Sequence, residues 1–146
     1  TAERATTSWF YVVNSDNIFL PGWDIYLEKA IQRFGDNNIY SSIMIEPRGN
    51  NGAFIIKNYG TEPENLDINK LLTDLDSLRS DEVTQGQNWP CLFPRNIFTS
   101  FDERMWPGWI SDNDICVSAF TVDNSIKFLR IKNSLIYHFM CNAQVG

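Results

Sequence analysis

The aromatic residues and carboxylates with the clearest potential for chemistry gather in residues 85–114. This segment holds three of the five tryptophans, three phenylalanines, three prolines and a run of acidic residues. Neither a helical nor a strand period runs through it, and it is too apolar for a disordered connection, so we expect a long functional loop. Aromatic rings and arginines dominate binding energy at protein interfaces, while charges steer the approach. The segment therefore predicts a partner-binding surface, made of Trp89, Phe98, Phe101, Asp102, Glu103, Arg104, Trp106, Trp109, Asp112 and Asp114.

The same residue types leave three other interpretations open. The segment could fold over the open side of a sheet as a plain packing lid. A lid of this kind could also close an apolar pocket that takes a small hydrophobic ligand. Carboxylates beside aromatic rings suit a small hydrolase acting on sugars, with Asp102, Glu103, Asp112 and Asp114 as candidates. The enzyme ranks last, because neither a nucleophile motif nor a metal-ligand set accompanies these carboxylates.

The single histidine, His138, lies between Tyr137 and Phe139 in an apolar run. This setting indicates a packed histidine on a sheet rather than a catalytic base. One histidine and no Cys-x-x-Cys pair exclude the common zinc sites. The segment Asp112-Asn113-Asp114 lacks the glycine and closing glutamate of a calcium loop. The sequence therefore predicts neither a metal nor a cofactor.

Three cysteines, Cys91, Cys116 and Cys141, leave at least one outside any intramolecular pair. A disulfide needs Cα atoms within about 7 Å of each other. In the strand arrangement expected below, Cys116 and Cys141 would lie more than about 20 Å apart. We therefore expect any disulfide to join Cys91 to Cys116 or to Cys141, with three reduced, buried cysteines as the alternative.

The charge balance limits the partners. A net charge of −6 and a pI near 4.6 oppose binding to nucleic acid and to anionic membranes, and they permit a basic protein partner. No run approaches about 18 apolar residues, so we expect no transmembrane segment. The chain opens at Thr1 without methionine, which fits either a processed protein or an excised domain. Together with the expected disulfide, this opening favours an extracytoplasmic location, periplasmic or secreted, over the cytoplasm.

The elements expected to position these residues belong to one domain spanning residues 1–146. Alternation and apolar stripes predict a strand at 8–14, a helix at 23–34, strands at 39–46 and 53–59, and a helix at 67–79. Asn51-Gly52 predicts that the middle strands form a hairpin. Gly35 is expected to end the first helix, and Asn65 or Asp67 to cap the second.

The C-terminal third carries three apolar runs at 115–122, 125–131 and 134–141, separated by two-residue polar breaks. We expect an antiparallel meander, although the last run would also suit a helix. The order β-α-β-β-α-long loop-β-β-β predicts an α+β fold, a mostly antiparallel sheet with two helices on one face. The leading functional hypothesis is a non-enzymatic protein-binding domain. Two roles fit it: an acidic inhibitor or immunity-type protein, and a subunit of an extracytoplasmic sensory or surface assembly.

Overall fold

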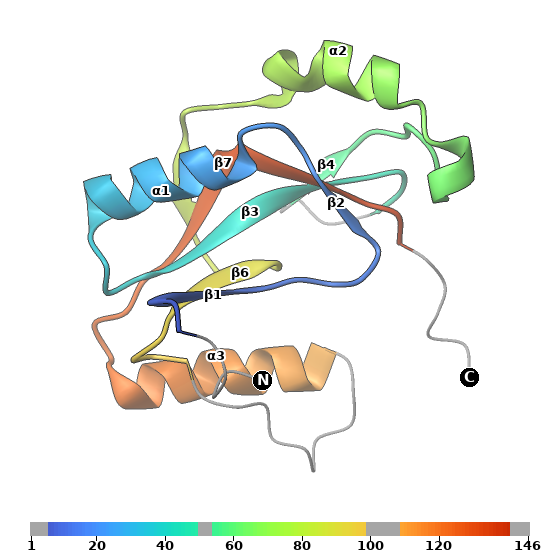
Figure 1. Ribbon diagram of the computed structural model, residues 1–146. Coiled ribbons are helices and arrows are strands. Elements are labelled where there is room, and N and C mark those ends of the chain that lie inside the picture. Colours follow the sequence, from blue (N-terminus) through green and yellow to red (C-terminus); the bar gives the residue numbers. More distant parts are fainter. Residues whose placement is uncertain (1–5, 50–53, 99–108, 141–146) are drawn as a thin grey trace.

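The computed structural model describes residues 6–49, 54–98 and 109–140, with the backbone alone for residues 109–112 (Figure 1). The fold is α+β, as predicted, and is built on a curled seven-stranded sheet. The strands are β1 (Trp9–Val12), β2 (Asn17–Phe19), β3 (Ile39–Glu46), β4 (Ile55–Ile56), β5 (Val83–Gln85), β6 (Cys91–Pro94) and β7 (Phe128–His138). The helices are α1 (Trp23–Phe34), α2 (Ile68–Leu78) and α3 (Trp109–Val122), with a 3-10 turn at Pro63–Asn65.

The sheet has the order β1-β6-β3-β7-β2, with β4 beside β3 and β5 beside β7. Among the described strands, four pairings are antiparallel, and the pairings of β3 with β4 and β7 are parallel. The sheet is therefore mixed: most of the described pairings are antiparallel, whereas its central pair, β3 and β7, is parallel. All eight residues of β3 are buried, as expected for a parallel strand covered on both faces.

Each helix covers its own part of the sheet, and Figure 1 shows α1 and α3 on opposite sides of it. The predicted pair of helices on one face is thus replaced by three helices among the described residues. Three apolar clusters hold these helices in place. The α1 cluster contains Leu27, Ala30, Tyr40, Leu129 and Ile131. The α2 cluster contains Leu71, Leu75, Ile43, Ile45, Leu135 and Tyr137 among others. The α3 cluster contains Ile115, Cys116, Ala119, Ile39, Phe93 and Phe128 among others.

The first two helices confirm what their apolar stripes predicted. In α1, Leu27 and Ala30 are the buried residues, and Gly35 ends the helix at φ 95° with its N–H donating to the Ile31 carbonyl at 2.8 Å. A residue with a Cβ rarely adopts this φ, which is why glycine suits the position. In α2, the Asp67 carboxylate caps the helix by accepting the Lys70 N–H at 3.0 Å.

The strand predicted at 115–122 is wrong, because these residues form the C-terminal part of α3. Its β-branched and aromatic residues favour a strand in isolation. The buried residues Ile115, Cys116 and Ala119 follow helical spacing instead, and they pack into the α3 cluster. Tertiary burial therefore overrides local propensity here, and the break at Asp123-Asn124 separates a helix from a strand.

The turn predicted at Lys132-Asn133 is also wrong, because β7 runs unbroken from Phe128 to His138. Opposite the step from Ser42 to Ile43 in β3, the register in β7 jumps from Ile131 to Leu135, so the intervening residues bulge out. The bulged polar side chains find partners outside the sheet. Lys132 pairs with Glu82 at 2.6 Å, and the Asn133 amide donates to Asp81 at 2.6 Å.

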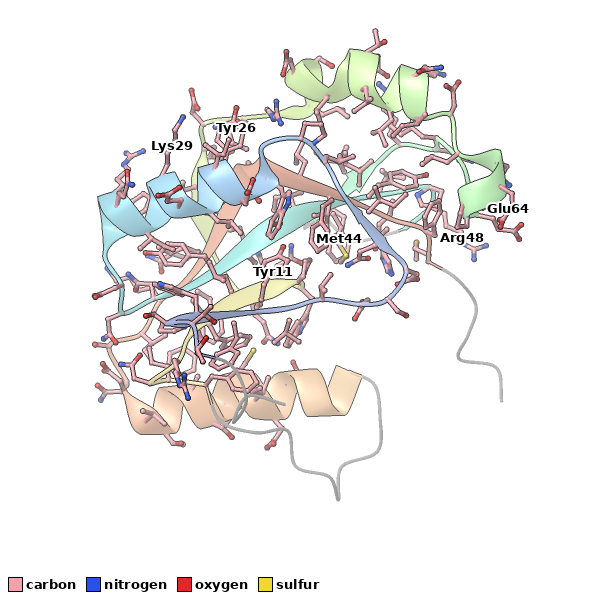
Figure 2. The ribbon with its side chains drawn as sticks, viewed as in Figure 1. Tyr11, Tyr26, Lys29, Met44, Arg48 and Glu64 are labelled. Carbon is pink, nitrogen blue, oxygen red and sulfur yellow. The ribbon has the colours of Figure 1, made fainter. Side chains whose placement is uncertain are left out.

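A buried polar network fastens this bulge from inside. The Ser42 hydroxyl lies 2.6 Å from the Tyr11 hydroxyl and 2.7 Å from the Ser134 hydroxyl, which in turn donates to the Trp23 carbonyl at 2.8 Å. The Asn88 amide donates to the Ser42 carbonyl at 3.0 Å. Burial raises the pKa of Tyr11, so its hydroxyl stays protonated in the core. Figure 2 shows Tyr11 and Met44 in the middle of the molecule, where this network joins β1, β3, β7 and α1.

The hairpin predicted from residues 39–59 is wrong, although its first strand, Ile39–Glu46, is confirmed. The strand β4 is only two residues long and runs parallel to β3, with Ile55 opposite Ile45. The Asn-Gly pair predicts a local turn, but it does not determine which strands pair on either side of that turn. Residues 50–53, which include this pair, lie outside the described residues. Four residues of the first predicted strand, Trp9–Val12, form β1.

The segment 85–114 is not one long loop. Its residues Cys91–Pro94 form β6, which lies inside the sheet between β1 and β3. Because this strand is only four residues long and prolines occur beside and within it, the alternation of apolar and polar residues could not reveal it. Trp109–Asp114 begin α3, and residues 99–108 lie outside the described residues.

Candidate functional site

Two residues of the predicted binding surface, Trp89 and Phe98, are half-buried and pack against the α3 cluster. The Trp89 ring lies 6.0 Å from the Phe93 ring, and the Phe98 ring lies 5.4 Å from Phe93 and 5.1 Å from Phe10. These two side chains therefore contribute to the packing between β6, β1 and α3.

The remaining predicted residues divide into two groups. Five of them, Phe101, Asp102, Glu103, Arg104 and Trp106, lie outside the described residues. The other three are brought together on α3: Trp109 and Asp112 lie in its first turns, and Asp114 is half-buried on the next. Part of the segment that was predicted to form a recognition surface thus lies on a helix.

Two apolar side chains of α3 remain partly exposed among the described segments, although the Phe120 ring also lies 5.1 Å from the Phe128 ring. Val117 and Phe120 lie three residues apart and share a helix face with Asn113, and they are 61% and 45% exposed. Ile115, Cys116 and Ala119 are buried on the sheet, and Phe120, four residues after Cys116, borders that buried side. The exposed half of α3 is therefore a candidate interface.

The same helix is acidic. It carries Asp112 and Asp114 and neither lysine nor arginine, and Asp123 follows its last turn. Hydrogen bonds from Ser125 and Asn37 lower the pKa of Asp123, so this carboxylate stays ionised well below neutral pH. The exposed apolar residues therefore lie next to negative charges.

A second group of titratable residues surrounds His138. Its Nδ1 lies 2.7 Å from a Glu46 carboxylate oxygen, and its Nε2 lies 3.2 Å from an Asp16 carboxylate oxygen. Burial alone would lower the pKa of His138, but the hydrogen bond to Glu46 and the charges of Asp16 and Glu46 outweigh it and raise that pKa. Both ring nitrogens are engaged, so His138 has no open nitrogen with which to act as a general base. The group is an internal ion network joining β2, β3 and β7.

Sequence reasoning could not have found the partners of His138. Nothing in the sequence distinguishes Asp16 and Glu46 from other polar residues at the ends of predicted elements. Only strand pairing brings them close to His138. The register places Asn17 opposite His138 and Ile45 opposite Tyr137. No group of three His, Cys, Asp or Glu side chains within the described ranges is arranged to hold a metal ion. Within the same ranges, no helix has the length and apolar character needed to cross a membrane.

The cysteines correct one prediction. Cys91 and Cys116 are both buried in the α3 cluster, and no disulfide joins them. The Cys91 thiol donates to the Asn88 carbonyl instead. The distance estimate for Cys116 assumed a strand at 115–122, whereas this cysteine lies on α3. Cys141, the other predicted partner of Cys91, lies outside the described residues.

We expect both buried thiols to be protected in the folded protein. In a Cys141→Ser variant, a thiol reagent should label Cys91 and Cys116 only after denaturant is added, because both side chains are buried. Adding a reductant should leave the melting temperature unchanged. A reductant-dependent loss of stability in this variant would instead show a disulfide between these two cysteines.

Comparison with known proteins finds no match: no family model, no curated protein and no solved structure is similar to this chain.

Proposed function

We propose that this chain is a non-enzymatic protein-binding domain that holds a partner with a basic surface. The outer face of α3 and the aromatic segment leading into it form the binding surface. The observation that carries the proposal is the exposure of Val117 and Phe120 on a helix with two carboxylates and no cation.

Charge supports this choice of partner. The chain has a net charge of −6, and the sequence of α3 includes Asp112 and Asp114 but neither lysine nor arginine. An acidic rim around an apolar centre attracts a basic partner over long range and excludes acidic ones. In such an interface, Trp106, Trp109 and Arg104 would supply the strongest contacts.

Two biological roles fit a surface of this chemistry. One is an acidic inhibitor or immunity-type protein that covers a basic toxin or enzyme. The other is a subunit of a sensory or surface assembly outside the cytoplasm. Both roles require the exposed face of α3 to bind a partner, and the identity of the captured partner distinguishes the two roles.

Substitutions on α3 test the proposal. Replacing Val117 or Phe120 with aspartate puts a charge in the centre of the interface, so retention of a basic partner should fall by at least about tenfold. The measurement is a pull-down with the tagged domain at low and high salt, because steering by charge weakens as salt rises. Alanine at Trp106 and Trp109 should weaken binding in the same way.

The matched control is Leu72→Asp. Leu72 is 43% exposed on α2, close to the 45% of Phe120, and it lies on a different helix. This variant should keep the partner, and circular dichroism melts should show all variants folded. A partner that stays bound to the folded α3 and tryptophan variants would refute the proposal.

A further inference from the structure

Three surface hollows adjoin one another along β5. The first, of about 380 Å³, lies between α1 and β5, and the second, of about 360 Å³, lies beside the C-terminal end of α1. They share Arg33, Phe34, Val83 and Asp81, whose carboxylate accepts a hydrogen bond from the Asn133 amide at 2.6 Å. The third hollow, of about 450 Å³, shares Gln85 and Lys127 with the second. The first two hollows, which adjoin each other on the α1 side of β5, are here called the β5 groove; the third lies towards α3, with Phe120 in its lining.

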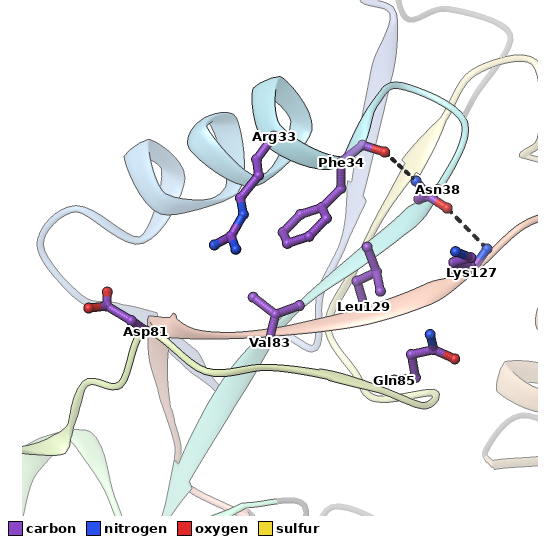
Figure 3. Close-up of a pocket in the computed structure, with 8 residues that line it drawn as sticks. All are labelled: Arg33, Phe34, Asn38, Asp81, Val83, Gln85, Lys127 and Leu129. Atoms are coloured by element: carbon purple, nitrogen blue, oxygen red, sulfur yellow. Dashed lines mark hydrogen bonds between the residues drawn. The ribbon is translucent and has the colours of Figure 1, made fainter.

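The floor of the β5 groove is apolar, and cations stand at its rim. Phe34, Val83 and Leu129 line the second hollow together with Arg33 and Lys127 (Figure 3). The Asn38 side chain holds one end of the hollow in shape, since it donates to the Phe34 carbonyl at 2.9 Å and accepts the Lys127 N–H at 3.2 Å.

Two cations of the rim lie over aromatic rings. The Arg33 guanidinium lies 4.8 Å from the centre of the Phe34 ring, and the Lys29 ammonium lies 5.5 Å from the centre of the Tyr26 ring. Figure 2 shows Tyr26 and Lys29 projecting from the same side of α1. Within the described ranges, no ion pair involves Lys29, Arg33 or Lys127. These three cations outnumber Asp81, the carboxylate that lines the first two hollows, and the resulting positive charge in a chain of net charge −6 favours an anionic ligand.

The strand that borders the groove has an open edge. Among the described strands, β5 pairs only with β7. The Gly86 N–H donates to the Phe128 carbonyl at 2.9 Å. Hydrogen-bonded pairs recur at every second residue of an antiparallel ladder, so Thr84 also turns its N–H and C=O towards β7. Val83 and Gln85 therefore turn theirs towards the open edge, and their side chains line the groove.

We propose that the β5 groove binds an extended acidic peptide that adds to β5 as a further strand. The backbone groups of Val83 and Gln85 would pair with the peptide backbone, as unpaired edge groups do with any added strand. Every second side chain of the peptide would face α1, where Lys29, Arg33 and Lys127 would select acidic residues whose methylene groups lie on the apolar floor.

This site is separate from the α3 face proposed above, and the two prefer opposite charges. The α3 face attracts a basic surface, whereas the β5 groove attracts an acidic segment. The third hollow borders Phe120, so variants of that residue are not suited to testing the groove.

The probe is a fluorescein-labelled peptide of eight alternating valine and glutamate residues with blocked ends. Its dissociation constant is measured by fluorescence anisotropy against the full chain. We expect Arg33→Glu and Lys127→Glu each to weaken binding by at least about tenfold, since each places like charges opposite one another. The matched control, Lys70→Glu, changes an exposed lysine on α2 outside the groove, and it should alter binding by less than about twofold.

Two further measurements decide between strand addition and simple charge attraction. The Val83 and Gln85 amides should become protected from hydrogen exchange when the peptide binds, and N-methylation of alternate peptide residues should abolish binding. Equal binding of the N-methylated peptide, or no binding of the unmodified one, would overturn the proposal. Binding of dodecanoate without protection of these amides would show that the groove takes a small anionic amphiphile, which also overturns it. Val117→Asp should leave peptide binding unchanged, so failure of this site is distinguishable from failure of the α3 surface.

Discussion

Replacing His138 with alanine is expected to lower the free energy of unfolding by roughly 2–4 kcal/mol. The side chain of Glu46 is only 5% exposed and bonds His138 at 2.7 Å, so the substitution leaves a buried carboxylate without this partner. Urea denaturation measures the change. In a double-mutant cycle, the cost of His138→Ala should shrink when Glu46 is already glutamine, because the two residues interact directly. Additive costs would show that the pair contributes nothing as a pair.

The same network predicts how stability varies with pH. The pKa of His138 is raised in the folded protein, so protonation of the imidazole favours the folded state. Its contribution is fully present below the unfolded value of about 6.5, and it is lost as pH rises through the folded pKa. The difference in unfolding free energy between the native chain and His138→Gln should therefore be largest near pH 6 and fall towards pH 9. A difference that grows with pH would contradict this assignment.

Tyr137 is expected to be the second position with a large effect. Its side chain is fully buried between β2 and β3, and its ring packs against Tyr59 and Phe139. Its hydroxyl accepts a hydrogen bond from the Tyr59 N–H at 3.1 Å and donates one to the Gly60 carbonyl at 2.5 Å. Tyr137→Ala should cost about 3–5 kcal/mol, because it opens a cavity in the α2 cluster.

Tyr137→Phe separates the ring from the hydroxyl. It keeps the packing and leaves the Tyr59 N–H and Gly60 carbonyl without their partner, which should cost about 1–3 kcal/mol. Denaturant unfolding of both variants checks the prediction. If phenylalanine costs as much as alanine, the hydroxyl rather than the packing holds the segment at Tyr59.

The sequence correctly predicted the two helices that are buried on one face only. The helix at Trp23–Phe34 and the helix ending at Leu78 carry apolar stripes of helical period, and both form as expected. The α+β class followed from their separation by strands. In contrast, the apolar residues of α3 include exposed ones, such as Val117 and Val122, as well as buried ones, such as Ile115 and Ala119, so no single stripe distinguished it from a strand.

The pairings that the sequence did not reveal are long-range. The parallel pair β3–β7 joins segments far apart in the chain, and the bulge after Ile131 depends on contacts with Asp81 and Glu82. Local patterns report where a chain turns, but not which distant strand it meets. The predictions of a hairpin at 39–59 and of a C-terminal meander were wrong for this reason.

The two candidate surfaces differ in the same way, because local composition pointed to one of them and only long-range packing forms the other. Aromatic and acidic composition pointed to residues 85–114, and part of that segment leads into the exposed face of α3. The β5 groove has no compositional signal, because Arg33, Val83 and Lys127 are each ordinary residues of separate elements. Only the packing of α1 on the β5–β7 pair brings them together.

The most direct test of the partner-binding account is site-specific photo-crosslinking with benzoyl-phenylalanine at position 117 and, as control, at position 72 of α2. Both positions are exposed on helices, and only position 117 lies on the proposed interface. The account predicts that one basic protein from the native source crosslinks at position 117 and not at 72, with a yield that falls as salt rises. Absence of crosslinking at position 117, or equal crosslinking at both positions, would contradict it.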